Sequence, residues 1–186
     1  MEPLQQVASE KRLSARLPLH HIDADAILNR IGEKHPEVSR IPQFAKEGLY
    51  ILARSLETES KLSHVGKIVA QSMLHGMALN LTMLSIWKEK NIISQIKMPE
   101  EPIIIAGLPR TGTTFLHRLM SMDTRHRALL AWEANQPTPP PELHTRDSDM
   151  RIKKMEDNLC MLKAISPDLV AIHPMAPKEP EECLNL

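Results

Sequence analysis

Glycine, threonine and arginine are concentrated in one short segment, Gly107-Leu108-Pro109-Arg110-Thr111-Gly112-Thr113-Thr114. Gly107 lets the chain turn sharply, Gly112 lets the backbone approach an anion, and Pro109 restricts the loop between them. Threonine hydroxyls and a guanidinium group are strong donors to a tetrahedral oxyanion. The segment predicts a binding site for a phosphate-like group. The residues expected at this site are Pro109, Arg110, Thr111, Gly112, Thr113 and Thr114.

The two glycines have the spacing of a phosphate-binding P-loop, but Thr113 and Thr114 stand where a nucleotide triphosphatase has Lys followed by Ser or Thr. That lysine contacts the β- and γ-phosphates of the nucleotide. An apolar run that ends in Asp, which such an enzyme uses to hold Mg²⁺, is also missing downstream. The sequence therefore disfavours a kinase or nucleotide triphosphatase.

Chemistry at such a site also needs a base, and the sequence offers several candidates. Glu133 is the first, because it lies beside Trp132 about twenty residues beyond the loop; its alternative role is a salt-bridged carboxylate. His173 follows the apolar residues 170–172, and its alternative is a structural histidine. His117 and the pair Glu181-Glu182 are the remaining candidates, with packing and a solvated chain segment as their alternatives.

The elements around the loop are predicted as a strand and a helix. The apolar, mainly β-branched run Ile103–Ala106 is bounded by proline and glycine, which is typical of a buried parallel strand. Residues 113–122 place Phe115, Leu116 and Leu119 at helical spacing. A turn from strand to helix leaves the first helical N–H groups unpaired and directed at the loop, which favours an anion there.

Residues 1–98 are predicted to form a helical region, and residues 99–186 a second region that contains the loop. Apolar residues recur every three or four positions between residues 22 and 90. We expect Asp23 to cap one helix, Pro42 to open a second that ends near Leu56, and Ser60 or Ser63 to start a third with a methionine-rich core face.

The second region continues with a proline-rich stretch, 136–141, which we expect to be an exposed loop or a polyproline helix. Asp147 is a predicted N-cap for a helix that carries Ile152, Met155 and Leu159 and ends near residue 165.

Composition excludes several classes of function. Lys and Arg total 23 and Asp and Glu total 23, so no overall field attracts nucleic acid or an anionic membrane. Polar residues interrupt the apolar segment 68–87, which argues against a membrane span. Two cysteines without a paired pattern and a polar N-terminus without a signal peptide predict a cytoplasmic protein.

The segment from Pro102 to Met120 closely resembles the 5′-phosphosulfate loop of sulfotransferases that use 3′-phosphoadenosine-5′-phosphosulfate (PAPS). The similarity is greatest to the branch with a helical N-terminal extension and the motif Pro-Arg-Thr-Gly-Thr-Thr. It extends through Trp132-Glu133 and His173-Pro174 to Glu181-Glu182-Cys183. The resemblance implies an α/β fold, with a partial parallel sheet in this chain, and PAPS as the sulfuryl donor.

The resemblance also implies roles for individual residues. Backbone N–H groups and hydroxyls of Thr111 to Thr114 would hold the 5′-phosphate, and Arg110 would neutralise charge on the departing adenosine 3′,5′-bisphosphate. Arginine does not readily donate a proton, so Arg110 is expected to be an electrostatic clamp. Arg110, Glu133 and His173 form the expected catalytic set. No metal is required, and the acceptor is a hydroxyl or amine of a small molecule or carbohydrate.

The sequence departs from this family in one respect. Relatives hold the donor's 3′-phosphate with an Arg and a Ser on a later strand and helix, and no Arg follows Arg151 here. We therefore expect the N-terminal part of a sulfotransferase domain, with doubtful activity on its own. Two alternatives stay open: a non-catalytic binding module that retains the loop, and a kinase with an unusual P-loop. The sequence leaves the oligomeric state open.

Overall fold

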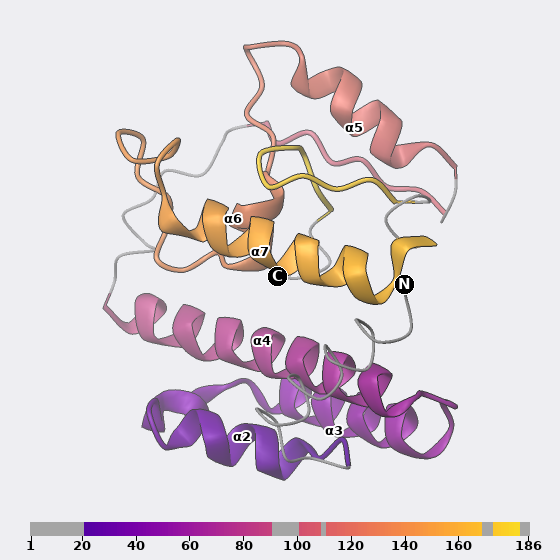
Figure 1. Cartoon of the computed structure of the whole chain (residues 1–186). Coiled ribbons are helices and arrows are strands. Elements are labelled where there is room, and N and C mark those ends of the chain that lie inside the picture. The colour runs from indigo at the N-terminus through magenta and orange to yellow at the C-terminus, as the bar shows by residue number, and fades with distance from the viewer. Residues whose placement is uncertain (1–20, 91–100, 109–110, 169–172, 183–186) are drawn as a thin grey trace. The chain divides into compact units, whose positions relative to one another are not determined.

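The chain forms two compact units, Met1–Lys90 and Asn91–Leu186, in a computed structural model. The structure describes residues 21–90, 101–108, 111–168 and 173–182. The predicted division at residue 98 falls in the range 91–100, outside the described residues. Figure 1 shows the helices of each unit, which are considered separately below.

The N-terminal unit contains helices α2 (Ala24–Gly32), α3 (Gln43–Thr58) and α4 (His64–Glu89), with a short 3₁₀ helix at Pro36–Arg40. The predicted Asp23 cap is confirmed, because its carboxylate accepts from the backbone N–H groups of Asp25 and Ala26. Of the two serines considered for α4, Ser63 is the cap, and its hydroxyl accepts from the Gly66 N–H. Helix α3 follows Pro42 and ends two residues later than predicted.

Helices α2 and α3 both pack against α4 (Figure 1). Ile27 and Ile31 of α2, Ala53 of α3, and Leu74 and Ala78 of α4 are buried together in one apolar core. The methionines of α4 were predicted to face the core. Met77 does pack against it, whereas Met73 is exposed. Burial of these faces is the main force that holds the helices together.

The carboxylate of Glu57 joins three segments of this unit. It accepts from the backbone N–H of Ile22 at 2.9 Å, pairs with Lys67 at 2.6 Å and contacts His21 at 2.9 Å. These donors, led by the Ile22 N–H, lower the Glu57 pKa to about 2 from an ordinary 4.5. Glu57 therefore links the start of α2 and the first turn of α4 to α3.

The C-terminal unit contains α5 (Thr113–Ser121), α6 (Ala131–Asn135) and α7 (Met150–Ile165). Helix α6 packs against α7, with Ala131, Trp132 and Met155 in a small core (Figure 1). The Arg151 guanidinium lies 4.8 Å from the centre of the Trp132 ring. Helix α6 was not predicted, because five residues are too short for a recognisable apolar period.

Three expectations for this unit are corrected. The cap of α7 is Asp149, whose carboxylate accepts from the Arg151 N–H, and not Asp147. The proline-rich stretch is not fully exposed: Thr138 is buried, because Arg151 donates to the carbonyls of Gln136 and Pro139 and ties the loop to α7.

The third correction concerns the strand at Ile103–Ala106. These residues form neither strand nor helix, and Ile104 is 82% exposed. A strand is defined by hydrogen bonds to a neighbouring strand, and the described part of the chain provides only an isolated antiparallel bridge, between Leu130 and Pro180. The predicted parallel sheet is therefore not formed among the described residues.

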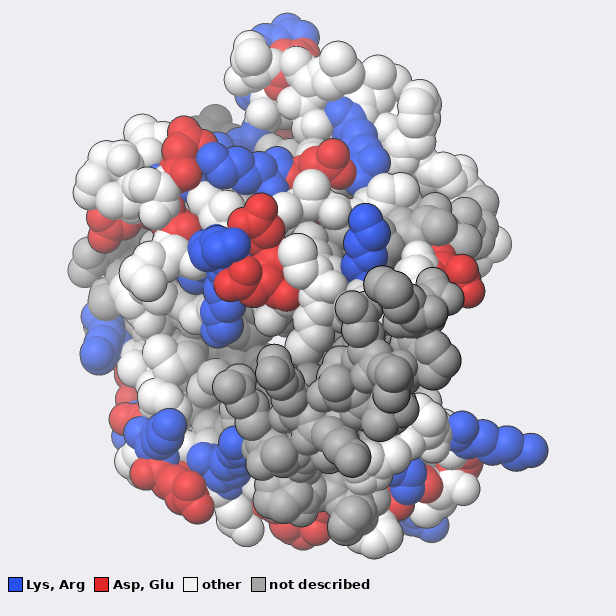
Figure 2. All heavy atoms as spheres, in the orientation of Figure 1, with Lys and Arg blue, Asp and Glu red and all other residues white. Residues whose placement is uncertain are grey.

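Charged side chains of both signs are interspersed on the face shown in Figure 2, with Lys and Arg mostly beside Asp and Glu. Any strong anion site is therefore local. Among the described residues, no helix has both the length and the apolar character needed to cross a membrane.

Candidate functional site

The glycines of the predicted anion loop have the geometry that the loop requires. Gly112 has a φ of 92°, in the left-handed region that glycine adopts without strain, and it is the N-cap of α5. A methyl group at Gly107 would lie 2.8 Å from Thr113 Cγ2 and 3.0 Å from Thr111 Oγ1. The close approach of residues 107 and 113 therefore depends on glycine. Pro109 and Arg110 lie outside the described residues.

Helix α5 offers its first N–H groups to the loop. Its first intrahelical bond is donated by Leu116 to the Gly112 carbonyl at 3.0 Å. The N–H groups of Thr113, Thr114 and Phe115 precede that bond, so the helix itself gives them no acceptor. Thr113 and Thr114 are half-buried at this position. The start of α5 can therefore bind an anion with backbone donors and the positive end of the helix dipole.

The hydroxyls of Thr111 and Thr114 donate to acceptors in the protein, whereas the sequence predicts that they donate to the anion. Thr111 donates to the Leu108 carbonyl at 2.7 Å, which closes the loop on itself. Thr114 donates to the Glu182 carboxylate at 3.3 Å. Neither contact was predicted, since Glu182 lies far along the chain and the sequence gives no signal that it returns to α5.

The segment 173–182 runs beside α5 and continues to α6 (Figure 1). Arg118 of α5 donates to the Pro174 carbonyl and pairs with Glu179, both at 2.6 Å. On the other side, the Ala131 N–H at the start of α6 donates to the Glu179 carbonyl at 2.9 Å. Arg118 therefore holds this segment against the loop helix.

His173 and Glu181, both in this segment, form an imidazole–carboxylate pair. Their Nε2 and Oε1 atoms are 3.3 Å apart, and the side chains are 30% and 11% exposed. The same Glu181 oxygen accepts from the Glu182 N–H at 3.0 Å. Because Glu182 contacts Thr114, one continuous set of contacts links His173 to the first turn of α5.

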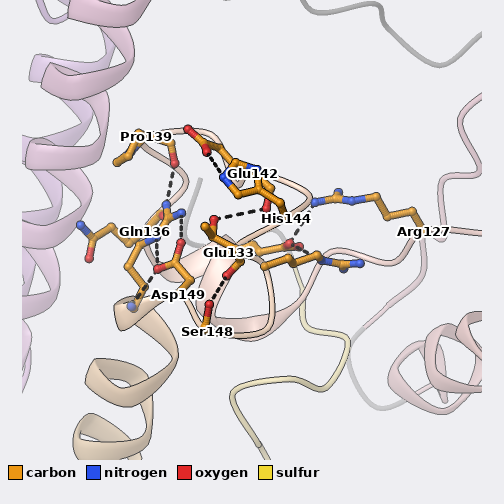
Figure 3. A network of polar contacts seen from close by, with 11 residues as sticks. Arg127, Glu133, Gln136, Pro139, Glu142, His144, Ser148 and Asp149 are labelled. Carbon is orange, nitrogen blue, oxygen red and sulfur yellow. Dashed lines mark hydrogen bonds and ion pairs between the residues drawn. The ribbon is translucent and has the colours of Figure 1, made fainter.

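Glu133 lies in a separate cluster, on the first turn of α6 (Figure 3). The side chain is only 2% exposed, and its Oε1 accepts from Arg127 at 2.9 Å and from Arg146 at 3.1 Å. Its Oε2 accepts from the Leu130 N–H at 3.0 Å. These contacts tie three chain segments together, which matches the salt-bridged alternative considered for this residue.

The predicted residues therefore fall into two groups. The first turn of α5 lies with Glu182, Glu181 and His173, whereas Glu133 lies with Arg127 and Arg146. Within the described ranges, no three His, Cys, Asp or Glu side chains are arranged to hold a metal ion.

Comparison with known proteins agrees with this geometry. A family model described as the sulfotransferase family matches residues 102–186. Residues 102–186 thus belong to the sulfotransferase family. The match to the sulfotransferase family covers the loop, α5 and the segment beside it. A search of curated proteins found no match.

A solved structure agrees with the assignment to the sulfotransferase superfamily. The crystal structure of sulfotransferase STF1 from Mycobacterium tuberculosis is similar to this chain, with a TM-score of 0.61 and 25% sequence identity. The similarity covers 87% of this chain and 45% of the mycobacterial chain. The chain therefore spans less than half the length of that sulfotransferase.

Proposed function

We propose that this chain carries the donor-binding loop of a PAPS-dependent sulfotransferase. The observation that carries the proposal is the left-handed Gly112 at the N-terminus of α5, within a segment that matches the sulfotransferase family. The proposed reaction transfers a sulfuryl group to a hydroxyl or amine of a small-molecule or carbohydrate acceptor. The parallel sheet of a complete sulfotransferase domain and the cytoplasmic setting stay predictions.

The residues present fit a 5′-phosphosulfate group. At Gly112 the missing Cβ leaves open space beside the backbone, whereas Gly107 lets Thr111 and Thr113 pack close to the chain. The first three N–H groups of α5 lack helical acceptors and lie at the positive end of the helix dipole. PAPS, when bound, supplies the activated sulfuryl group. Thr113 and Thr114 would hold the 5′-phosphate through their N–H groups, and Arg110 would offset negative charge on the leaving group.

For the base we propose His173 rather than Glu133. The His173 ring is partly exposed and oriented by Glu181 through one nitrogen, which leaves Nδ1 to take a proton from the acceptor. Its contacts through Glu181 and Glu182 end at Thr114, on the proposed donor site. Glu133 is enclosed by two guanidinium groups, so we propose that it supports the fold.

A thermal-shift comparison tests the donor site. Adenosine 3′,5′-bisphosphate is expected to raise the melting temperature of the chain, whereas Mg-ATP is not, because a ligand that binds the folded state stabilises it, and a tighter ligand stabilises it more. A preference for Mg-ATP would contradict the proposal in favour of a kinase. No shift with either ligand would favour the non-catalytic binding module.

The matched variants are Gly112→Ala and Gly48→Ala. Alanine at residue 112 is strained by roughly 1–2 kcal/mol in the left-handed region and displaces the N–H groups, so the shift with adenosine 3′,5′-bisphosphate should disappear. Gly48 lies exposed in α3 with no atom within 4 Å of an added Cβ, so its variant should keep the shift.

A further inference from the structure

A groove of about 470 Å³ opens between the C-terminal end of α5 and the start of α6. Its ionisable lining residues are all of basic type: Arg125, His126, Arg127, Arg146 and Lys178. No acidic side chain of the described residues lines it. The lining of the groove is therefore basic, although acidic partners lie nearby.

The acidic partners of these groups lie behind or outside the groove. Arg127 and Arg146 share a single oxygen of Glu133, whose side chain is 2% exposed (Figure 3). That contact uses one nitrogen of each guanidinium, and a guanidinium has five N–H donors in all. Two positive charges on one buried carboxylate leave an excess of one, and the Arg127 and Arg146 side chains are 58% and 29% exposed.

Arg125 and Lys178 are paired as well, and both basic groups are exposed. Lys178 contacts Asp147 at 3.4 Å, and its side chain is 51% exposed. Arg125 pairs with Asp123, and its side chain is 84% exposed. Exposed ion pairs contribute little free energy, so the Lys178 ammonium can turn to a ligand at small cost. Arg125 contacts Asp123 through Nε and Nη2, which leaves its Nη1 donors for a ligand.

This arrangement suits a specific class of ligand. Several guanidinium groups and an ammonium group around one space match the multiple oxygens of a phosphate or sulfate monoester. The volume lies within the range of sites for small organic molecules and exceeds what an inorganic ion fills. We infer that the groove binds a phosphate or sulfate monoester on a sugar-sized ligand.

The groove is distinct from the donor loop. Helix α5 has nine residues, so Gly112 and the groove at Ser121 are separated by about 13 Å along the helix. The two sites therefore lie at opposite ends of one helix, and the inference goes beyond the proposed sulfuryl transfer.

Isothermal titration calorimetry with glucose 6-phosphate and glucose on the full chain tests the inference. Glucose 6-phosphate should bind, and glucose should not. The double variant Arg125→Gln/Lys178→Gln should weaken binding by at least about tenfold, because it removes two charged donors. These side chains are exposed, so the variant should fold. Lys153→Gln, an exposed lysine of α7 outside the groove, should leave the affinity unchanged.

Three results would overturn the inference: no binding of glucose 6-phosphate, equal binding of glucose, or unchanged affinity in the double variant. The Gly112→Ala variant separates the two sites, because it should retain glucose 6-phosphate binding. Loss of that binding in Gly112→Ala would place the ester at the loop instead. A chain that binds glucose 6-phosphate but not adenosine 3′,5′-bisphosphate would refute the proposed function and leave the groove site standing.

Discussion

At the scale of single residues, Glu133 and His173 differ in burial and in the number of their hydrogen bonds. Glu133 is almost fully enclosed and accepts three hydrogen bonds, while His173 keeps part of its ring exposed. Both were predicted as site residues from their positions after the loop. Their partners could not be predicted, because Arg146 and Glu181 reach them only through the fold of the chain between them.

The Glu133→Gln substitution tests the supporting role of this carboxylate. Loss of the charge leaves two guanidinium groups without their buried partner, so the free energy of unfolding should fall by roughly 2–3 kcal/mol. Urea unfolding measures the change. Glu142→Gln, which removes a carboxylate from an exposed pair with His144, should change it by less than about 1 kcal/mol. Equal effects of the two substitutions would contradict the supporting role.

The His173→Gln substitution tests the proposed base. Removal of a general base should lower the rate of sulfuryl transfer from PAPS by about 10²- to 10⁴-fold. Affinity for adenosine 3′,5′-bisphosphate should stay the same, because the imidazole contacts Glu181 and not the described residues of the loop. Turnover with a panel of hydroxyl and amine acceptors and calorimetry of the bisphosphate measure the two quantities. A normal turnover rate in this variant would remove His173 from the mechanism.

At the scale of elements, the helices could be predicted better than the strand. Periodic apolar residues and caps such as Asp23 are local signals, and helical hydrogen bonds are local as well. The segment 103–106 has the composition of a buried strand, but its hydrogen bonds depend on a neighbour that the described residues do not provide. Helix α5 formed where predicted because Gly112 and its own apolar spacing suffice to start it.

The cap of α4 gives a test at this scale. Ser63→Ala removes the acceptor of the Gly66 N–H and should lower the free energy of unfolding by about 1 kcal/mol. Ser60→Ala is the comparison, because Ser60 lies outside α4 and donates to the Leu56 carbonyl instead. Chemical denaturation of both variants should give the larger loss for Ser63→Ala. The reverse order would mean that the Ser60 bond to α3 contributes more stability than the Ser63 cap of α4.

At the scale of the whole molecule, each compact unit has a core of its own. The N-terminal core joins three helices, whereas the C-terminal core, as far as the described residues show it, lies between α6 and α7. Each unit also contains one of the two tryptophans, Trp87 in α4 and Trp132 in α6. Replacing either one with phenylalanine therefore leaves a fluorescent reporter in the other unit.

Acid unfolding should distinguish the two units through Glu57. Its folded pKa of about 2 lies below the ordinary 4.5, so the unfolded chain binds more protons between these values. The stabilisation from Glu57 is complete above pH 4.5 and is lost as the pH falls toward 2. Glu57→Gln removes it at every pH, so the variant should be less stable than the parent at pH 7, and the difference should shrink below pH 4.5.

Fluorescence during urea unfolding at pH 7 and pH 3 measures this difference in each unit. In the Trp132→Phe background, where Trp87 reports, Glu57→Gln should lower the urea midpoint at pH 7 and lower it less at pH 3. In the Trp87→Phe background the midpoint reported by Trp132 should not move, because the contacts of Glu57 with described residues, Ile22, His21 and Lys67, all lie in the N-terminal unit. Equal shifts from both reporters would mean that the two units unfold as one cooperative structure.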